Sequence, residues 1–240
     1  MFFDQQEFDI RCEWGSAGLA QFVSHSDAII IVDVLSFSTC VDIAVGRGAS
    51  VYPYRWKDAS ALVYAQAHGA MLASPNRQVM TGYSIAPTSL LRIPAGTRLV
   101  LPSPNGATLS MATGQVPTFA GCLRNARAVA EAVQTLGRRI SLIPAGEQWP
   151  DGTLRPAIED LVGAGAIIQH LAGTRSPEAA MAQATFRCLQ DNLVTGLKQC
   201  SSGKELIARG LEMDVALAAA LNQSASIPVL RDGAHVQQTV

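Results

Sequence analysis

Acidic and hydroxyl-bearing residues follow the first long apolar run of the sequence. The run is Ala28–Val32, and Asp33, Ser36, Ser38 and Thr39 come directly after it. If the run is a strand and a helix begins near Ser38, the first amide groups of that helix form a site for an anion beside a carboxylate. The structural alternative is that Asp33 ends the strand and a hydroxyl group caps the helix.

Two later segments carry similar residue types. Asn105 and Gly106 predict a tight turn whose amide groups converge on one point, although such turns are often only structural. The segment from Gly146 to Arg155 contains Glu147 and ends on a cation. Ligands of open α/β sheets bind beyond the carboxyl ends of the strands. These segments therefore belong to one site if each of them follows a strand.

The acidic pair Glu159 and Asp160 opens an apolar stretch that extends to Ile168. A helix in this stretch has almost no polar face, so we expect it to be buried. A buried carboxylate without a partner is costly, and a metal ion or an arginine is therefore the favoured explanation for the pair. The alternative is that both acids only favour the positive N-terminus of the helix.

Together these residues suit Mg²⁺ and a phosphate ester, because Mg²⁺ prefers hard oxygen ligands. We predict Asp33 and Glu147 as metal ligands. The predicted catalytic residues are Asp33, Glu159 and Asp160, with one of the last two transferring a proton or supporting the metal ligands. Attack on phosphorus by water is the simpler mechanism, and attack by a carboxylate stays open. The predicted substrate-binding residues are Ser36, Ser38, Thr39, Asn105, Gly106 and Arg155.

Motifs of several other phosphate and metal chemistries are absent from the sequence. It has neither a Gly-x-x-x-x-Gly-Lys-Ser/Thr loop nor a Gly-x-Gly-x-x-Gly segment after a strand. The residue two positions after Asp33 is Leu35, which excludes the Asp-x-Asp phosphatase pattern. The four histidines do not approach the spacing of a zinc site, and we expect them at the surface or as caps.

Short apolar runs alternate with helical patterns up to about residue 145 and predict the framework that positions these residues. We expect a loop over Gly146–Arg155 and a helix with Pro156 at its first position, followed by a mainly helical region. The predicted fold is one layered α/β/α unit over residues 1–240 with a largely parallel or mixed sheet. A subdivision near residue 145 is left open. The main predicted strands are Ala28–Val32, Ser50–Tyr54, Arg98–Leu101, Ile140–Pro144 and Ile227–Leu230.

The composition excludes several classes of protein. Hydrophobic residues make up 48% and charged residues 15% of the chain, which is typical of a globular protein with a large core. With a net charge of −1 and no basic run, nucleic acid is not an expected partner. No apolar run approaches the roughly 20 residues of a membrane helix, and no export signal is evident. The five cysteines form no CxxC, so we expect reduced, mostly buried thiols in the cytoplasm; a homo-oligomer stays open.

Several motifs, in the same order and at similar spacing, resemble the 2-phosphosulfolactate phosphatase (ComB) family. The agreement extends from about residue 28 to 234. No single motif decides the matter, but their collinear order is specific. The segments that carry the resemblance are Asp33–Leu35, Asn105–Gly106, Glu159–Ala166, Ser202–Leu206 and Ile227–Gly233.

The resemblance implies an α/β fold and a Mg²⁺-dependent phosphatase that hydrolyses (2R)-2-phospho-3-sulfolactate in coenzyme M biosynthesis. It also implies a small phosphorylated or sulfonated acid as the ligand. The sequence departs from the family where an arginine is replaced by Ser36 and an acid by Asn76. These departures allow an alternative, in which a ComB-like protein binds a small anionic ligand but has lost turnover.

Overall fold

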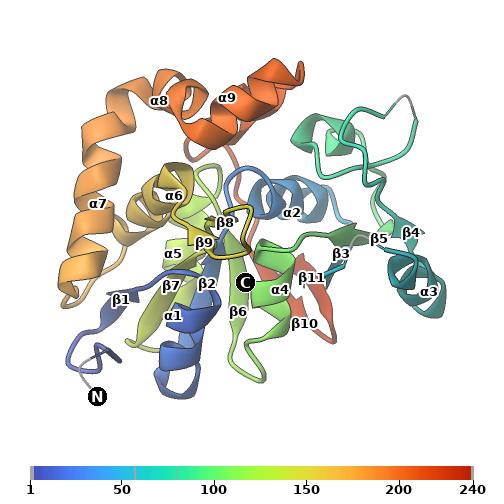
Figure 1. Ribbon diagram of the computed structural model, residues 1–240. Coiled ribbons are helices and arrows are strands. Elements are labelled where there is room, and N and C mark those ends of the chain that lie inside the picture. Colours follow the sequence, from blue (N-terminus) through green and yellow to red (C-terminus); the bar gives the residue numbers. More distant parts are fainter. Residues whose placement is uncertain (1–2, 57, 80, 239–240) are drawn as a thin grey trace.

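The computed structural model describes residues 3–56, 58–79 and 81–238, and in it helices cover both faces of a central sheet (Figure 1). The strand order is β1-β7-β2-β6-β10-β11-β3-β5-β4. A separate hairpin pairs β8 with β9. The strands are β1 (Ile10–Cys12), β2 (Ala28–Val32), β3 (Ser50–Tyr54), β4 (Met71–Leu72), β5 (Arg98–Pro102), β6 (Thr118–Gly121), β7 (Ile140–Pro144), β8 (Glu147–Gln148), β9 (Leu154–Arg155), β10 (Pro228–Arg231) and β11 (Ala234–Gln237).

The large sheet consists of two parallel parts joined by an antiparallel hairpin. The first part contains β1, β7, β2 and β6, and the second contains β3, β5 and β4. The hairpin β10–β11 pairs antiparallel with β6 on one side and with β3 on the other. The three antiparallel pairings reverse the strand direction, so the two parallel parts run in opposite senses along the sheet.

The twist of the sheet brings the carboxyl end of β5 round towards that of β2. Five pairings separate these strands. At about 20° to 25° per pair, the accumulated twist is about 100° or more, which offsets much of the reversal. The hairpin is joined to β6 and to β3 through a single residue pair each, Val229 with Phe119 and His235 with Val51.

Strand β2 is buried on both faces, as its apolar sequence predicts. Ile30 and Val32 belong to the cluster that includes helices α5 and α6, whereas Ile29 and Ile31 pack with residues of α1 and α4. Two helical layers therefore enclose the sheet, and the predicted layered α/β/α fold is confirmed. The helices are α1 (Gly15–Phe22), α2 (Phe37–Gly46), α3 (Ser60–Ala67), α4 (Gly106–Met111), α5 (Ala126–Gln134), α6 (Ile158–Ile168), α7 (Pro177–Leu189), α8 (Leu193–Gln199), α9 (Ser201–Ala208) and α10 (Glu212–Ala218).

Glycines on α6 explain why this helix lies so close to its neighbours. A Cβ on Gly163 would stand 2.6 Å from a methyl carbon of Val34, and a Cβ on Gly165 would overlap the carbonyl oxygen of Ala182 in α7. The close packing against the β2 side of the sheet fixes the first turn of α6, which carries Glu159 and Asp160.

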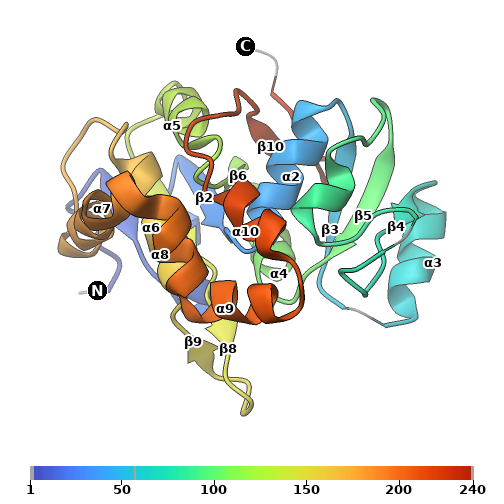
Figure 2. The same cartoon turned by 90° about the horizontal axis from the view of Figure 1, so that it is seen from above.

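Three sequence predictions need correction. The segment Gly146–Arg155 is not a simple loop, because β8 and β9 pair within it and form a hairpin that projects from the body (Figure 2). Helix α6 begins at Ile158 with Ala157 as its N-cap, so Pro156 precedes the helix. His235 is neither at the surface nor a cap, because it is fully buried beside Ser110, with 3.2 Å between Nε2 and Oγ.

Four of the five cysteines are buried and all five are free thiols. None of the helices in the described part of the chain is long and apolar enough to cross a membrane.

Candidate active site

Asp33 stands at the end of β2, where its carboxylate joins two segments of the chain. One oxygen accepts the amide of Phe37 at 3.1 Å, and the other accepts the amide of Gly106 at 2.9 Å. A Cβ on Gly106 would stand 2.8 Å from the same carboxylate oxygen, so the close approach requires glycine. Burial raises the pKa of Asp33, and the two amide groups oppose this shift. The turn after β5 thus meets the tip of β2.

The hydroxyl groups after Asp33 hold the connection to α2. Ser38 Oγ donates to the carbonyl of Ile31 and accepts the amide of Asp33, both at 3.0 Å. Thr39 Oγ1 donates to the carbonyl of Val34 at 2.8 Å. The structure thus gives these two hydroxyl groups a structural role, and their predicted contact with substrate stays a prediction.

Asp160 connects the ends of the neighbouring strands β2 and β7. Its two carboxylate oxygens accept the amides of Val34 at 2.7 Å and of Gly146 at 2.9 Å. Burial and the nearby charges of Asp33 and Glu159 raise the pKa of Asp160. Gly146 has a φ of +68°, a conformation that favours glycine. Asp160 therefore positions the two loops that carry Asp33 and Glu147.

Glu147 begins β8 directly beyond β7. Its carboxylate accepts the side-chain amide of Asn105 at 2.8 Å, which places the turn after β5 between the ends of β2 and β7. Burial, followed by the charge of Asp33, raises the pKa of Glu147 to about 7. Both Glu147 and Asn105 line a cavity of about 230 Å³. The side chain is therefore reachable by a small molecule.

Glu159 is buried in the first turn of α6, with only 2% of its surface exposed. Its charge acts on Asp33 and on Glu147, which places the three carboxylates in one group. Its carboxylate also contacts the thiol of Cys200; burial, together with this carboxylate, raises the pKa of Cys200 to about 12. The thiol is therefore protonated at neutral pH.

Two arginines reach this carboxylate group. Arg155 is the backbone partner of Glu147 in the β8–β9 hairpin and its charge acts on the Glu147 carboxylate, while its Nη2 donates to Ser202 Oγ at 3.2 Å. Arg77 comes from the segment after β4, and its Nη1 donates to Ser36 Oγ at 3.0 Å. The structure thus brings cations from two distant segments to the ends of β2 and β7.

A family model described as 2-phosphosulpholactate phosphatase matches residues 19–233. The chain belongs to this family. The probable 2-phosphosulfolactate phosphatase of Carboxydothermus hydrogenoformans is 28% identical over 211 residues, which cover 85% of this chain and 87% of that protein. Proteins with the same description from Gloeobacter violaceus and Thermosynechococcus vestitus are 26% and 27% identical, each over 84% of this chain and over 87% and 88% of their own lengths.

In this member of the 2-phosphosulpholactate phosphatase family, only some of the residues predicted for the site contact one another. Asp33, Gly106, Asn105 and Glu147 form one chain of contacts. Arg77 is the residue that sequence reasoning missed. The signal that could have indicated it is the arginine directly after Asn76, the position where the family has an acid. The roles in the site remain predictions.

Proposed function

We propose that this protein is a Mg²⁺-dependent phosphatase that hydrolyses the phosphate ester of a small acid, with 2-phosphosulfolactate as the first substrate to test. In the reaction, water adds to phosphorus and the ester oxygen leaves with a proton, which gives phosphate and a hydroxy acid. The observation that carries the proposal is that one turn after β5 holds both Asp33 and Glu147, with Glu159, Arg77 and Arg155 near enough for their charges to act on one or both of these carboxylates. Family membership supports the same chemistry.

The donor set suits Mg²⁺. Asp33 and Glu147 offer carboxylate oxygens, and each of these oxygens has lone-pair capacity beyond the hydrogen bonds described above. Within the described residues, no group of three or more acidic, histidine or cysteine side chains is arranged to hold a metal ion. Mg²⁺ is commonly bound through one or two carboxylates, with water and substrate phosphate as the other ligands, so two protein ligands suffice. When bound, Mg²⁺ neutralises charge on the phosphoryl oxygens.

The turn at Asn105 and Gly106 holds the side chains of the two proposed metal ligands in fixed positions. Gly106 orients Asp33 through its amide, and Asn105 orients Glu147 through its side chain. Because one turn holds both carboxylates, their separation is set before substrate arrives. Such preorganisation is a large part of the catalytic advantage in phosphoryl transfer.

Of the acidic pair on α6, Glu159 is the better candidate for proton transfer. Each oxygen of Asp160 is occupied by a backbone amide, which suits a positioning role. The neighbouring Glu159 acts on both proposed metal ligands. We therefore assign proton transfer to Glu159 and the alignment of the two loops to Asp160.

The direct test is a phosphatase assay on 2-phosphosulfolactate and related phosphorylated acids, with and without Mg²⁺. Turnover that needs Mg²⁺ supports the proposal. Ligand-dependent thermal stabilisation without turnover of any of these esters would instead favour the non-catalytic, anion-binding alternative. The structure weakens one reason for that alternative, because Arg77 supplies a cation beside Ser36.

A further inference from the structure

Arg77 has open hydrogen-bonding capacity at the edge of the carboxylate group. Its Nη1 donates to Ser36 Oγ at 3.0 Å and to the carbonyl of Ile85 at 2.8 Å. A guanidinium group has five N–H donors, and these two bonds use those of Nη1. Within the described residues, the Nε and Nη2 atoms make no further hydrogen bond. Three donors in a planar fork therefore remain for an anion.

Arg77 also borders a cavity, which is distinct from the cavity that Glu147 and Asn105 line. Arg77 is half-buried and lines a cavity of about 550 Å³. The volume is sufficient for a phosphorylated three-carbon acid. The other lining residues are Gln78, Val79, Thr88, Ser89 and Leu211.

Arg77 lies near enough to Asp33 for its positive charge to affect the binding of an anion beside the carboxylates. Ser36, which Arg77 contacts, lies three residues after Asp33, and the charge of Arg77 acts on the Asp33 carboxylate. The carboxylates of Asp33, Glu147 and Glu159 together repel a phosphate dianion. An anion can approach them only if nearby cations offset this repulsion, and the open donors of Arg77 are suited to this.

We propose that Arg77 binds the phosphoryl group and that Ser36 orients its guanidinium by accepting a hydrogen bond. This inference rests on the proposed function, because it assigns a substrate contact within the same site. It also assigns a role to Ser36. The hydroxyl group at position 36 does not bind the anion itself but directs a cation that arrives from another segment of the chain.

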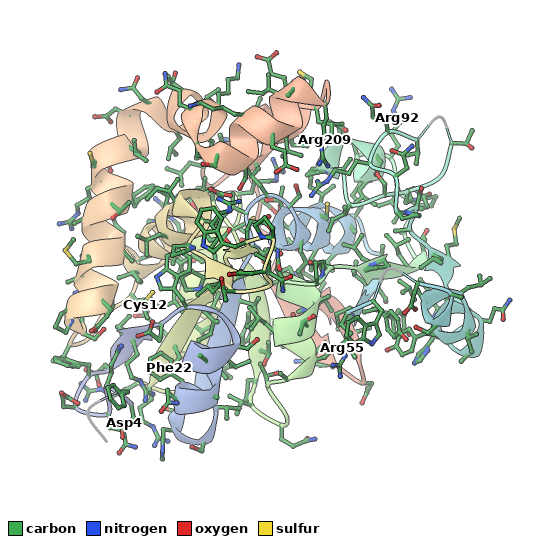
Figure 3. The ribbon with its side chains drawn as sticks, in the orientation of Figure 1. Asp4, Cys12, Phe22, Arg55, Arg92 and Arg209 are labelled. Carbon is green, nitrogen blue, oxygen red and sulfur yellow. The ribbon has the colours of Figure 1, made fainter. Side chains whose placement is uncertain are left out.

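The first experiment measures the binding of inorganic phosphate by calorimetric titration in the presence of Mg²⁺. Loss of a charge-assisted contact predicts about 10- to 150-fold weaker binding by Arg77→Gln, and a smaller loss for Arg77→Lys, which keeps the charge without the fork. The matched control is Arg92→Gln, because Arg92 is exposed and points outward (Figure 3). The control should bind phosphate within about twofold of the unaltered protein, since its charge lies at the surface.

Unchanged phosphate affinity in Arg77→Gln would overturn the assignment. Thermal melting of each variant shows whether it is folded. If Arg77→Gln does not fold, Arg77→Lys provides the comparison, and equal affinity of that variant and the unaltered protein would count against the fork. Phosphate binding that depends on Arg77 without any ester hydrolysis would refute the phosphatase function and leave this inference intact. Ester hydrolysis by Arg77→Gln with an unchanged KM would support the phosphatase function and refute the role of Arg77 in binding the phosphoryl group.

A second experiment tests the orienting role of Ser36. Ser36→Ala removes the acceptor and keeps the charge, so phosphate binding should weaken by about two- to tenfold. The exchange Ser36→Arg with Arg77→Ser should bind phosphate more tightly than Arg77→Ser alone, because the cation returns to the same place from the other segment. If Ser36→Ala binds as tightly as the unaltered protein, or if the exchange restores nothing, Ser36 has no part in orienting the cation.

Discussion

Replacing Gly106 by alanine tests whether the close contact with Asp33 holds the carboxylate in its working position. The added Cβ would stand 2.6 Å from Cδ1 of Phe37 and 2.8 Å from Oδ2 of Asp33. Unstrained contacts need about 3.5 Å or more, so the surrounding groups must move by about 1 Å. The Phe37 ring is fully buried and meets the His235 ring edge-on at 6.0 Å. We therefore expect Asp33 and the turn at Gly106 to move apart.

A displacement of this size predicts about a 10²-fold loss in kcat/KM. Overpacking should also lower the stability by about 1 to 3 kcal/mol, which corresponds to a decrease in Tm of about 2 to 4 °C per kcal/mol for a protein of this size. Kinetics on the best phosphate ester and thermal melting measure the two effects. The control is Gly196→Ala on α8, where the nearest atom is the flexible end of Leu189 at 3.3 Å.

Activity within about threefold of the unaltered protein, together with the expected fall in Tm, would refute the claim that this contact positions Asp33 for catalysis. An unchanged Tm would show that the turn accommodates the methyl group and that the close approach does not require glycine. A loss of activity in the Gly196→Ala control would indicate a general effect of added methyl groups rather than an effect at Asp33.

Three further predictions concern the site and the core. Asp33→Asn should keep the fold, as judged by circular dichroism, and lose at least about 10²-fold in activity, because it removes the charge from a proposed metal ligand; full activity would leave Asp33 with a structural role only. Treatment with EDTA should abolish turnover and Mg²⁺ should restore it better than Zn²⁺, because the donors are oxygens; undiminished activity after EDTA would contradict the metal assignment. Burial lowers the pKa of His235 to about 3, whereas an unfolded histidine titrates near 6.5. The unfolded chain therefore binds the proton first, and the contribution of His235 to stability is complete above about pH 6.5 and falls by about 1.4 kcal/mol per pH unit below it. Melting curves at pH 7 and pH 5 should show a smaller acid loss in His235→Gln than in the unaltered protein or in His25→Gln, and equal losses in all three would contradict it.

The sequence predicts the elements of this fold better than their arrangement. The apolar run Ala28–Val32 predicts a strand buried on both faces, because a short run without any polar residue is typical of a strand covered on both sides. The structure confirms this prediction. The reversal between the two parallel parts of the sheet is not predictable in the same way. It depends on where the hairpin β10–β11 inserts, and strand order is a long-range property that periodicity does not contain.

For the candidate site, too, the sequence predicts the residues better than their arrangement. Asp33 and Glu147 could be predicted as neighbours because each follows a predicted strand, and Glu159 and Asp160 could be predicted as buried because they open an apolar stretch. The separate tasks that we propose for Glu159 and Asp160 could not be predicted, because they depend on which amide groups face the oxygens of Asp160. Arg77 was missed for a similar reason. It lies 41 residues from Ser36 along the chain, and only the folded structure shows that the two meet.

The position of β10 and β11 in the chain has a consequence for the order of assembly. These two strands follow all the others along the sequence, yet they lie in the middle of the sheet between β6 and β3. During synthesis, both outer parts of the sheet emerge before the strands that unite them. Asp33 follows a strand of one part and Gly106 follows a strand of the other, so we expect their contact to form late in folding. We therefore expect the nascent chain to expose two unpaired inner strand edges, at β6 and β3, until the hairpin covers them, and unpaired strand edges promote aggregation.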